Sequence, residues 1–178
     1  DTPASDAMAL EGARLNALYL ERAVADGSDI EARCGMSQAS LVAGIAVGIT
    51  DVSGTHSIAE AVGAVYDLPH GQCCAIGMPM IMEYNLPVSK GKYARLAHAF
   101  GIDTSTMDEE SAAKAAISYV RDRNDRLGIP KLIDLINEAD LDLLAEKAFA
   151  NTSTPSNPRN AGVSDFREMF VLELQRNS

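Results

Sequence analysis

Residues 56–71 read HSIAEAVGAVYDLPHG, and this stretch decides the fold. Apolar residues recur at helical spacing as far as Tyr66, and residues 67–69 then form a turn that ends in proline. His56 lies in the first turn of one predicted helix, and His70 opens the next. Two helices joined by so short a turn are neighbours and often run antiparallel. The stretch therefore predicts a helix hairpin with an imidazole near the start of each helix.

The rest of the chain predicts more helices and no strand, which indicates an all-α domain of about eight helices. Pro79 is expected to kink the helix that begins at His70. The apolar run ASLVAGIAVGI, residues 39–49, predicts a central helix buried on all sides. The expected helices, with approximate bounds, cover residues 6–26 (capped by Ser5 or Asp6), 29–49, 55–66, 70–85, 87–100, 109–127, 130–137, 141–150 and 164 onward.

Composition narrows the class of protein. The length of 178 residues favours one domain, 1–178, and a hydrophobic content of 47 % is ordinary for a globular protein. A net charge of −10 disfavours a nucleic-acid partner. Three cysteines form no disulfide framework, which favours a reducing, cytoplasmic compartment. The run 39–49 is shorter than a bilayer span, so no membrane partner is expected.

The two hairpin histidines suggest a metal site, because neutral imidazole is the commonest protein ligand for transition metals. Glu60 shares a helix face with His56 and could be a third ligand, an outer hydrogen-bond acceptor or a general base. An antiparallel hairpin would separate the two helix starts by roughly 15 Å, which argues against a shared ion. The alternative is structural: His56 caps a helix, Glu60 is a solvated acid and His70 belongs to a turn.

The remaining candidates favour structural roles. His98 lies among predicted core-facing residues in ARLAHAF and is interpreted as an ordinary helix histidine. The adjacent Cys73 and Cys74 lack the spacing of a zinc knuckle or a redox pair, so packing is expected for both. Cys34 is expected to be inert.

Four stretches together resemble the iron-containing alcohol dehydrogenase family. GTHSIAEAVGAVYDLPHG resembles the family's metal-binding signature, with the P-H-G that ends it. The other three resemble the entry into its helical domain, the helix after the second histidine, and the loop and last helix near its C-terminus: TPASDAMALEGARL, HGQCCAIGMPMIMEYN and TSTPSNPRNAGVSDFREMF. The resemblance covers nearly the whole chain.

This resemblance implies a dehydroquinate-synthase-like enzyme with two domains. An N-terminal α/β domain binds NAD(P), and the C-terminal helical domain, represented here, supplies ligands to Fe(II) or Zn. His56 and His70 match two of the family's metal ligands, and the resemblance implies that the fold brings them to one ion. The other two ligands come from a D-A-x-x-H helix expected just before residue 1. Glu60 stands where the family usually has a second histidine.

The sequence therefore predicts the C-terminal metal-binding domain of an enzyme that transfers hydride between an alcohol or aldehyde and NAD(P). We expect the chain to be a piece of a longer protein and inactive by itself, because it has no cofactor-binding half. A homo-oligomer is compatible with the resemblance. One alternative is a helical interaction or dimerisation module without catalytic activity. Another is an independent metal protein that uses His56, Glu60 and His70 as a facial triad.

Overall fold

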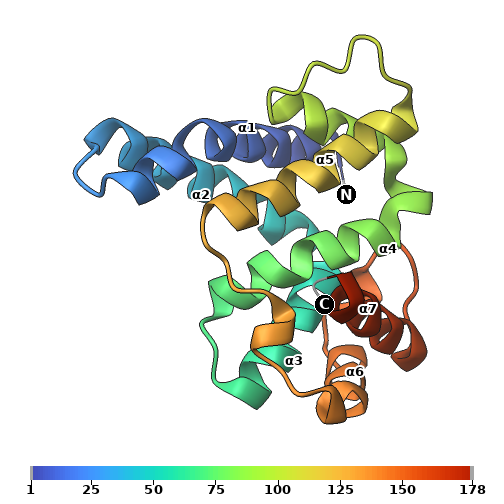
Figure 1. Ribbon diagram of the computed structural model, residues 1–178. Helices are drawn as coiled ribbons and strands as arrows, with labels where there is room; N and C mark the ends of the chain where they lie inside the picture. The colour runs from blue at the N-terminus through green and yellow to red at the C-terminus, as the bar shows by residue number, and fades with distance from the viewer. Residues whose placement is uncertain (1, 177–178) are drawn as a thin grey trace. The chain divides into compact units, whose positions relative to one another are not determined.

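The computed structural model describes residues 2–176, and within that range the chain is helical with no strand (Figure 1). The expected all-α fold is confirmed, with seven α-helices in the described range rather than about eight. The α-helices are α1 (Pro3–Ala25), α2 (Ile30–Thr50), α3 (Ser53–Tyr66), α4 (His70–Ala99), α5 (Glu109–Arg126), α6 (Leu141–Phe149) and α7 (Val163–Arg176). Three short 3₁₀ helices are η1 (Leu132–Asp134), η2 (Glu138–Asp140) and η3 (Thr154–Ser156).

Helix α4 corrects one expected boundary, because it continues through both Pro79 and Pro87 instead of ending near residue 85. A proline inside a helix leaves the carbonyl four residues earlier without its backbone donor. For Pro79 that carbonyl belongs to Ala75, and the side-chain amide of Asn124 donates to it at 2.7 Å. The bond that Pro79 removes is thus replaced from another helix.

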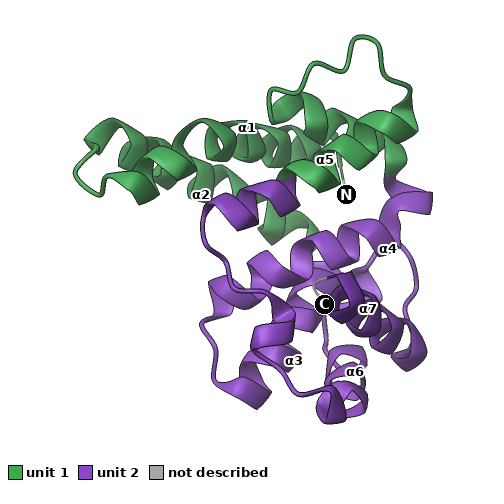
Figure 2. Cartoon of the chain, viewed as in Figure 1, with its two compact units in different colours: residues 1–51, 90–119 green, residues 52–89, 120–178 purple. Residues whose placement is uncertain are grey.

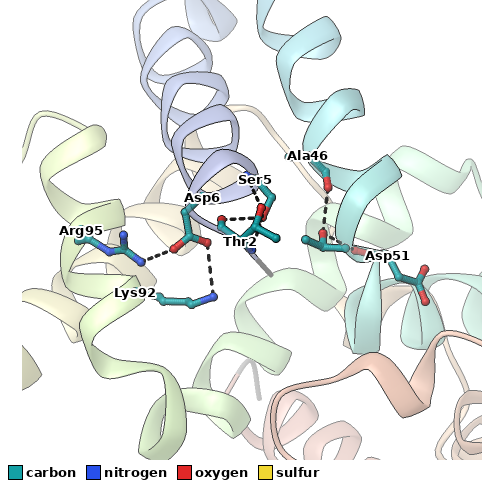
Figure 3. Close-up of polar contacts among 8 residues, drawn as sticks. Thr2, Ser5, Asp6, Ala46, Asp51, Lys92 and Arg95 are labelled. Atoms are coloured by element: carbon teal, nitrogen blue, oxygen red, sulfur yellow. Dashed lines mark hydrogen bonds and ion pairs between the residues drawn. The ribbon is translucent and has the colours of Figure 1, made fainter.

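Two further expectations need correction at helix ends. Helix α1 is capped by Thr2, not by Ser5 or Asp6: the Thr2 hydroxyl accepts from the Ser5 backbone N–H, and the Ser5 hydroxyl accepts from the Thr2 N–H (Figure 3). The expected helix over 130–137 is replaced by the 3₁₀ turn η1, which follows Gly128 at a φ of +69°. The predicted cap of α2 is confirmed, since Asp29 accepts from the N–H of Ala32 at 2.9 Å.

The helices form two compact units, which Figure 2 shows in different colours. Unit 1 consists of residues 1–51 and 90–119, and unit 2 consists of residues 52–89 and 120–178. Both α4 and α5 contribute to each unit. The single domain expected from the length remains a prediction.

In unit 1, α1 and α2 pack against each other through small residues. The Tyr19 ring lies directly over Gly35, where any side chain would collide with it. The buried residues of α2 form one narrow stripe, Ala32, Gly35, Ala39 and Ala46. The expectation that this helix is buried on all sides is therefore wrong: Leu41 is 65 % exposed. An apolar composition predicts burial but does not reveal how many faces of the helix have a neighbour.

Among residues 2–176, α2 alone is long and apolar enough to cross a membrane by length and composition. The sequence argument counted only the uninterrupted run 39–49, whereas the whole helix has 21 residues. A core helix of a soluble protein passes the same test, so this is weak evidence for a span.

An ion cluster links α1 to α4 within unit 1. Asp6 accepts from Arg95 at 2.6 Å and lies 3.5 Å from the Lys92 ammonium (Figure 3). Close to the start of α1, the Thr50 hydroxyl donates to the carbonyl of Ala46 in the last turn of α2 (Figure 3).

Unit 2 contains the larger hydrophobic core, built where α3, α6, α7 and the first part of α4 meet. Phe166 and Phe170 of α7 are fully buried there, beside Ile58 of α3 and Leu144 of α6. This core supports the hairpin that carries His56 and His70.

Candidate metal centre

The hairpin of α3 and α4 is held closely together by two glycines. A Cβ at Gly77 would lie 3.0 Å from the Cγ2 of Ile58, and one at Gly63 would lie 3.7 Å from the sulfur of Cys73. The early part of α4 therefore faces the late part of α3, and the later part faces the start of α3. The two helices run antiparallel, as the short turn predicted.

His56 and His70 nevertheless meet. Their ring centroids are 5.0 Å apart, with an angle of 53° between the ring planes. The estimate of roughly 15 Å counted only the backbone rise between helix starts. The side chains extend toward each other from two closely packed helices, so the rings are much closer than the helix starts. His56 is partly buried, and His70 is exposed.

Cys74 completes a three-residue cluster. Its sulfur lies 3.4 Å from Nε2 of His70 and 3.9 Å from Nε2 of His56. One potential ligand atom from each of the three residues lies within 4.8 Å of the other two. Burial, with smaller effects from Cys73 and Glu60, raises the pKa of the Cys74 thiol to about 11. The thiol is thus protonated at neutral pH in the absence of a cation.

Glu60 lies one turn after His56 but outside this cluster. Its carboxylate is exposed, and its Oε2 accepts a hydrogen bond of 2.6 Å from the side-chain amide of Asn151. Asn151 follows α6, so the segment between α6 and α7 fixes the position of the carboxylate. Nothing in the sequence links two residues so far apart in the chain.

The same segment is anchored to the hairpin at two buried points. The Thr154 hydroxyl lies within hydrogen-bond distance of two acceptors, the Ser57 hydroxyl at 2.8 Å and the carbonyl of Ala148 at 2.7 Å. The amides of Asn85 and Asn157 exchange two hydrogen bonds, of 2.9 and 2.8 Å. Residues 151–162 thus form an ordered segment beside the start of α3.

One buried polar atom at the site lacks a protein partner. Among residues 2–176, Nδ1 of His56 is buried and makes no hydrogen bond, while Nε2 of the same ring faces Cys74. Buried polar nitrogens are nearly always satisfied in folded proteins. This nitrogen is therefore an exception among the polar atoms of the site.

The structure thus brings together His56 and His70, and Glu60 lies nearby with its own partner. The two adjacent cysteines differ: Cys73 is buried in the core and Cys74 packs against that core, as expected for both, but Cys74 also faces the histidines. The sequence did contain a signal for Cys74, because it lies one helical turn after His70. His98 belongs to unit 1 and is exposed, which corrects its expected place among core-facing residues.

Known proteins show which family has this sequence and fold. The family described as "Fe-containing alcohol dehydrogenase family, C-terminal" matches residues 1–172. The chain belongs to the iron-containing alcohol dehydrogenase family. Choline dehydrogenase of Bacillus subtilis (strain 168) is 40 % identical over 159 residues, which are 89 % of this chain and 40 % of that protein. NAD-dependent methanol dehydrogenase of Bacillus methanolicus is 38 % identical, over 97 % of this chain and 46 % of its own length.

Solved structures of the iron-containing alcohol dehydrogenase family share the helical fold. A crystal structure of 1,3-propanediol oxidoreductase is similar with a TM-score of 0.94 and 34 % identity, over 97 % of this chain and 46 % of that one. An alcohol dehydrogenase from Oenococcus oeni gives 0.93 and 32 %, over 97 % and 45 %. The chain therefore spans less than half the length of these relatives.

Proposed function

We propose that this chain is the metal-binding helical half of an enzyme that transfers hydride between a small alcohol or aldehyde and NAD(P). The observation that carries the proposal is the pair of imidazoles 5.0 Å apart in a member of the iron-containing alcohol dehydrogenase family. The names of the relatives favour hydroxyl compounds as substrates and NAD as cofactor, since they include a choline dehydrogenase and an NAD-dependent methanol dehydrogenase.

The residues present fit a divalent transition metal, Fe(II) or Zn. The donor set contains two imidazoles, whose neutral nitrogens bind such ions. Nε2 of His56 is the nitrogen that faces the other side chains of the cluster, so it is the atom that would bind the ion. When bound, the ion supplies Lewis acidity at the oxygen of the alcohol or aldehyde.

His56 and His70, both in unit 2, would hold the ion. The buried core beneath them, which includes Ile58 and Cys73, keeps water from reaching the site through the protein. The start of α3, which carries His56, packs against α4 at Gly77, and the start of α4, which carries His70, packs against α3 at Gly63. The site therefore depends on helix packing rather than on a mobile loop.

Glu60 is proposed as the general base that takes the hydroxyl proton of the alcohol. Its Oε2 is engaged by Asn151, so we assign the proton to Oε1. Asn151 acts as a positioning residue, because it limits the rotation of the carboxylate. A carboxylate in this place carries out proton transfer that an imidazole would otherwise perform.

The remaining expectations concern the whole enzyme. We propose that NAD(P) binds mainly to a domain outside these 178 residues, so residues 1–178 alone should not turn over substrate. A cytoplasmic location, the absence of nucleic-acid and membrane partners, and a homo-oligomer compatible with the family remain expectations.

The test uses the intact protein, with NAD⁺ or NADP⁺ and short alcohols such as methanol and 1,3-propanediol, while formation of the reduced cofactor is followed. The wild type should be active. His56→Ala and His70→Ala should lose activity and bound metal together, whereas His98→Ala should keep both. A folded wild type with neither bound metal nor turnover would favour the interaction module instead.

Glu60 is tested separately. Glu60→Gln should lower kcat by about 10²–10⁴ while metal content stays unchanged, since a general base contributes on that scale. Loss of the metal in Glu60→Gln would instead favour the facial triad of His56, Glu60 and His70. Asn151→Ala should shift the pH profile of kcat/KM, an effect that a purely structural role would not produce.

A further inference from the structure

We infer that Cys74 is a third protein ligand, so that the His56–His70 pair forms a two-nitrogen, one-sulfur site suited to Zn²⁺. The inference rests on the part of the proposed function that places an ion between the two histidines. It does not depend on hydride transfer. The resemblance implies only histidine and aspartate ligands, so a thiolate changes the chemistry of the centre.

The distances fit a tetrahedral ion. With Zn–S of about 2.3 Å and Zn–N of about 2.0–2.1 Å, a sulfur and a nitrogen bound to the same tetrahedral ion lie about 3.6 Å apart. The Cys74 sulfur lies 3.4 Å from Nε2 of His70 and 3.9 Å from Nε2 of His56, on either side of that value. The three candidate ligand atoms lie within 4.8 Å of one another, so side-chain rotation would bring them onto a common ion.

The placement of Cys74 on α4 supports the same conclusion. Residues four apart on a helix share one face, so Cys74 projects on the same side as His70. Its neighbour Cys73 is 1 % exposed in the core. Cys74 is only partly buried: it packs against the same core, and its sulfur also faces two ring nitrogens.

A thiolate favours a softer ion. Thiolate ligands select zinc, and zinc also binds mixed nitrogen and sulfur sites more tightly than Fe(II) does. Cys74 binds as the thiolate, so its proton passes to solvent as the ion enters, and no electron is transferred. A tetrahedral ion held by these three residues has one position left, so it would take the substrate or only one of the two ligands that the resemblance implies from the preceding helix.

The test replaces the native ion of the intact protein with Co²⁺ and records its absorption spectrum. A cobalt–thiolate bond should produce a strong near-ultraviolet charge-transfer band, which imidazole and carboxylate ligands do not produce. Cys74→Ala should abolish the band and weaken Zn²⁺ binding at least about 10-fold, the lower range for loss of even an indirect partner. Cys34→Ala, which changes an exposed thiol on α2, should leave both unchanged.

Three results would separate the possibilities. If the wild type binds Co²⁺ without the band, Cys74 is not a ligand while the two-histidine site stands. If the wild type binds no Co²⁺ at all, both the inference and the proposed metal function fail. If Cys74→Ala does not fold, alkylation of the wild type decides: Zn²⁺ should protect Cys74 and leave Cys34 reactive, and equal alkylation of Cys74 with and without Zn²⁺ overturns the inference.

Discussion

The buried pair of amides between Asn85 and Asn157 allows the sharpest stability prediction. The two side chains are 2 % and 5 % exposed, and they exchange hydrogen bonds of 2.9 and 2.8 Å. Asn157 also donates to the carbonyl of Arg159 at 2.6 Å. This pair therefore ties the segment before α7 to the middle of α4.

Asn157→Ala should destabilise this contact by about 2–6 kcal/mol. The substitution leaves one buried donor and one buried acceptor of Asn85 without partners, and each such group costs about 1–3 kcal/mol. The double variant Asn85→Ala/Asn157→Ala should cost less than the sum of the two single variants, because neither orphan remains in it.

Hydrogen exchange of the α4 amides, read by mass spectrometry on the intact protein, measures the local free energy of opening. A loss of about 2–6 kcal/mol corresponds to exchange that is roughly 30-fold to about 10⁴-fold faster, at about 1.4 kcal/mol per tenfold change. Asn160→Ala is the matched control, since that side chain is exposed. Exchange in Asn157→Ala within threefold of wild type, or strict additivity in the double variant, would refute the reasoning.

Three other predictions follow from contacts within single units. Tyr66→Phe should cost about 1–2 kcal/mol in thermal unfolding, because the hydroxyl donates to Asp140 at 2.6 Å; burial raises the pKa of Tyr66, so this contribution should persist below pH 10 and fade above it. Gly77→Ala should lower the free energy of unfolding by about 1–3 kcal/mol, since the new methyl would lie 3.0 Å from Ile58. It should also weaken Zn²⁺ binding measured by calorimetry, and unchanged affinity would count against the packing argument. Two lysine partners lower the pKa of Glu110 from 4.5 to about 2. The wild type should therefore lose stability as pH falls from 4.5 towards 2, and Glu110→Gln should lack this pH-dependent stabilisation. A normal carboxyl titration of Glu110 by NMR would contradict this.

Local patterns predicted the hairpin, because helical spacing, a turn and a glycine or proline at each boundary all act over a few residues. The same reasoning failed at Pro87 and at α2. The predicted helix 70–85 already passed through Pro79, where Asn124 of another helix satisfies the carbonyl of Ala75, but the continuation through Pro87 was not predicted. The exposure of α2 depends on which faces have a neighbour, and an apolar composition does not report this.

In the site, too, local features were predictable from the sequence and long-range contacts were not. The chemistry of His56 and His70 was readable from the sequence, but their proximity depended on side chains that reach across two antiparallel helices. Cys74 could have been predicted from its spacing to His70, and the adjacent Cys73 hid that signal because a cysteine pair suggests packing. Asn151 carries no local signal, since its contact with Glu60 exists only after the segment beyond α6 folds back onto α3.

The central claim is that His56 and His70 bind one common ion, and anomalous diffraction tests it most directly. Crystals of the intact protein with Zn²⁺ should be measured on both sides of the zinc absorption edge. The account predicts one strong anomalous peak within about 2.0–2.1 Å of a ring nitrogen of each histidine. A zinc peak bound elsewhere, or two ordered imidazoles with no peak between them, would contradict it.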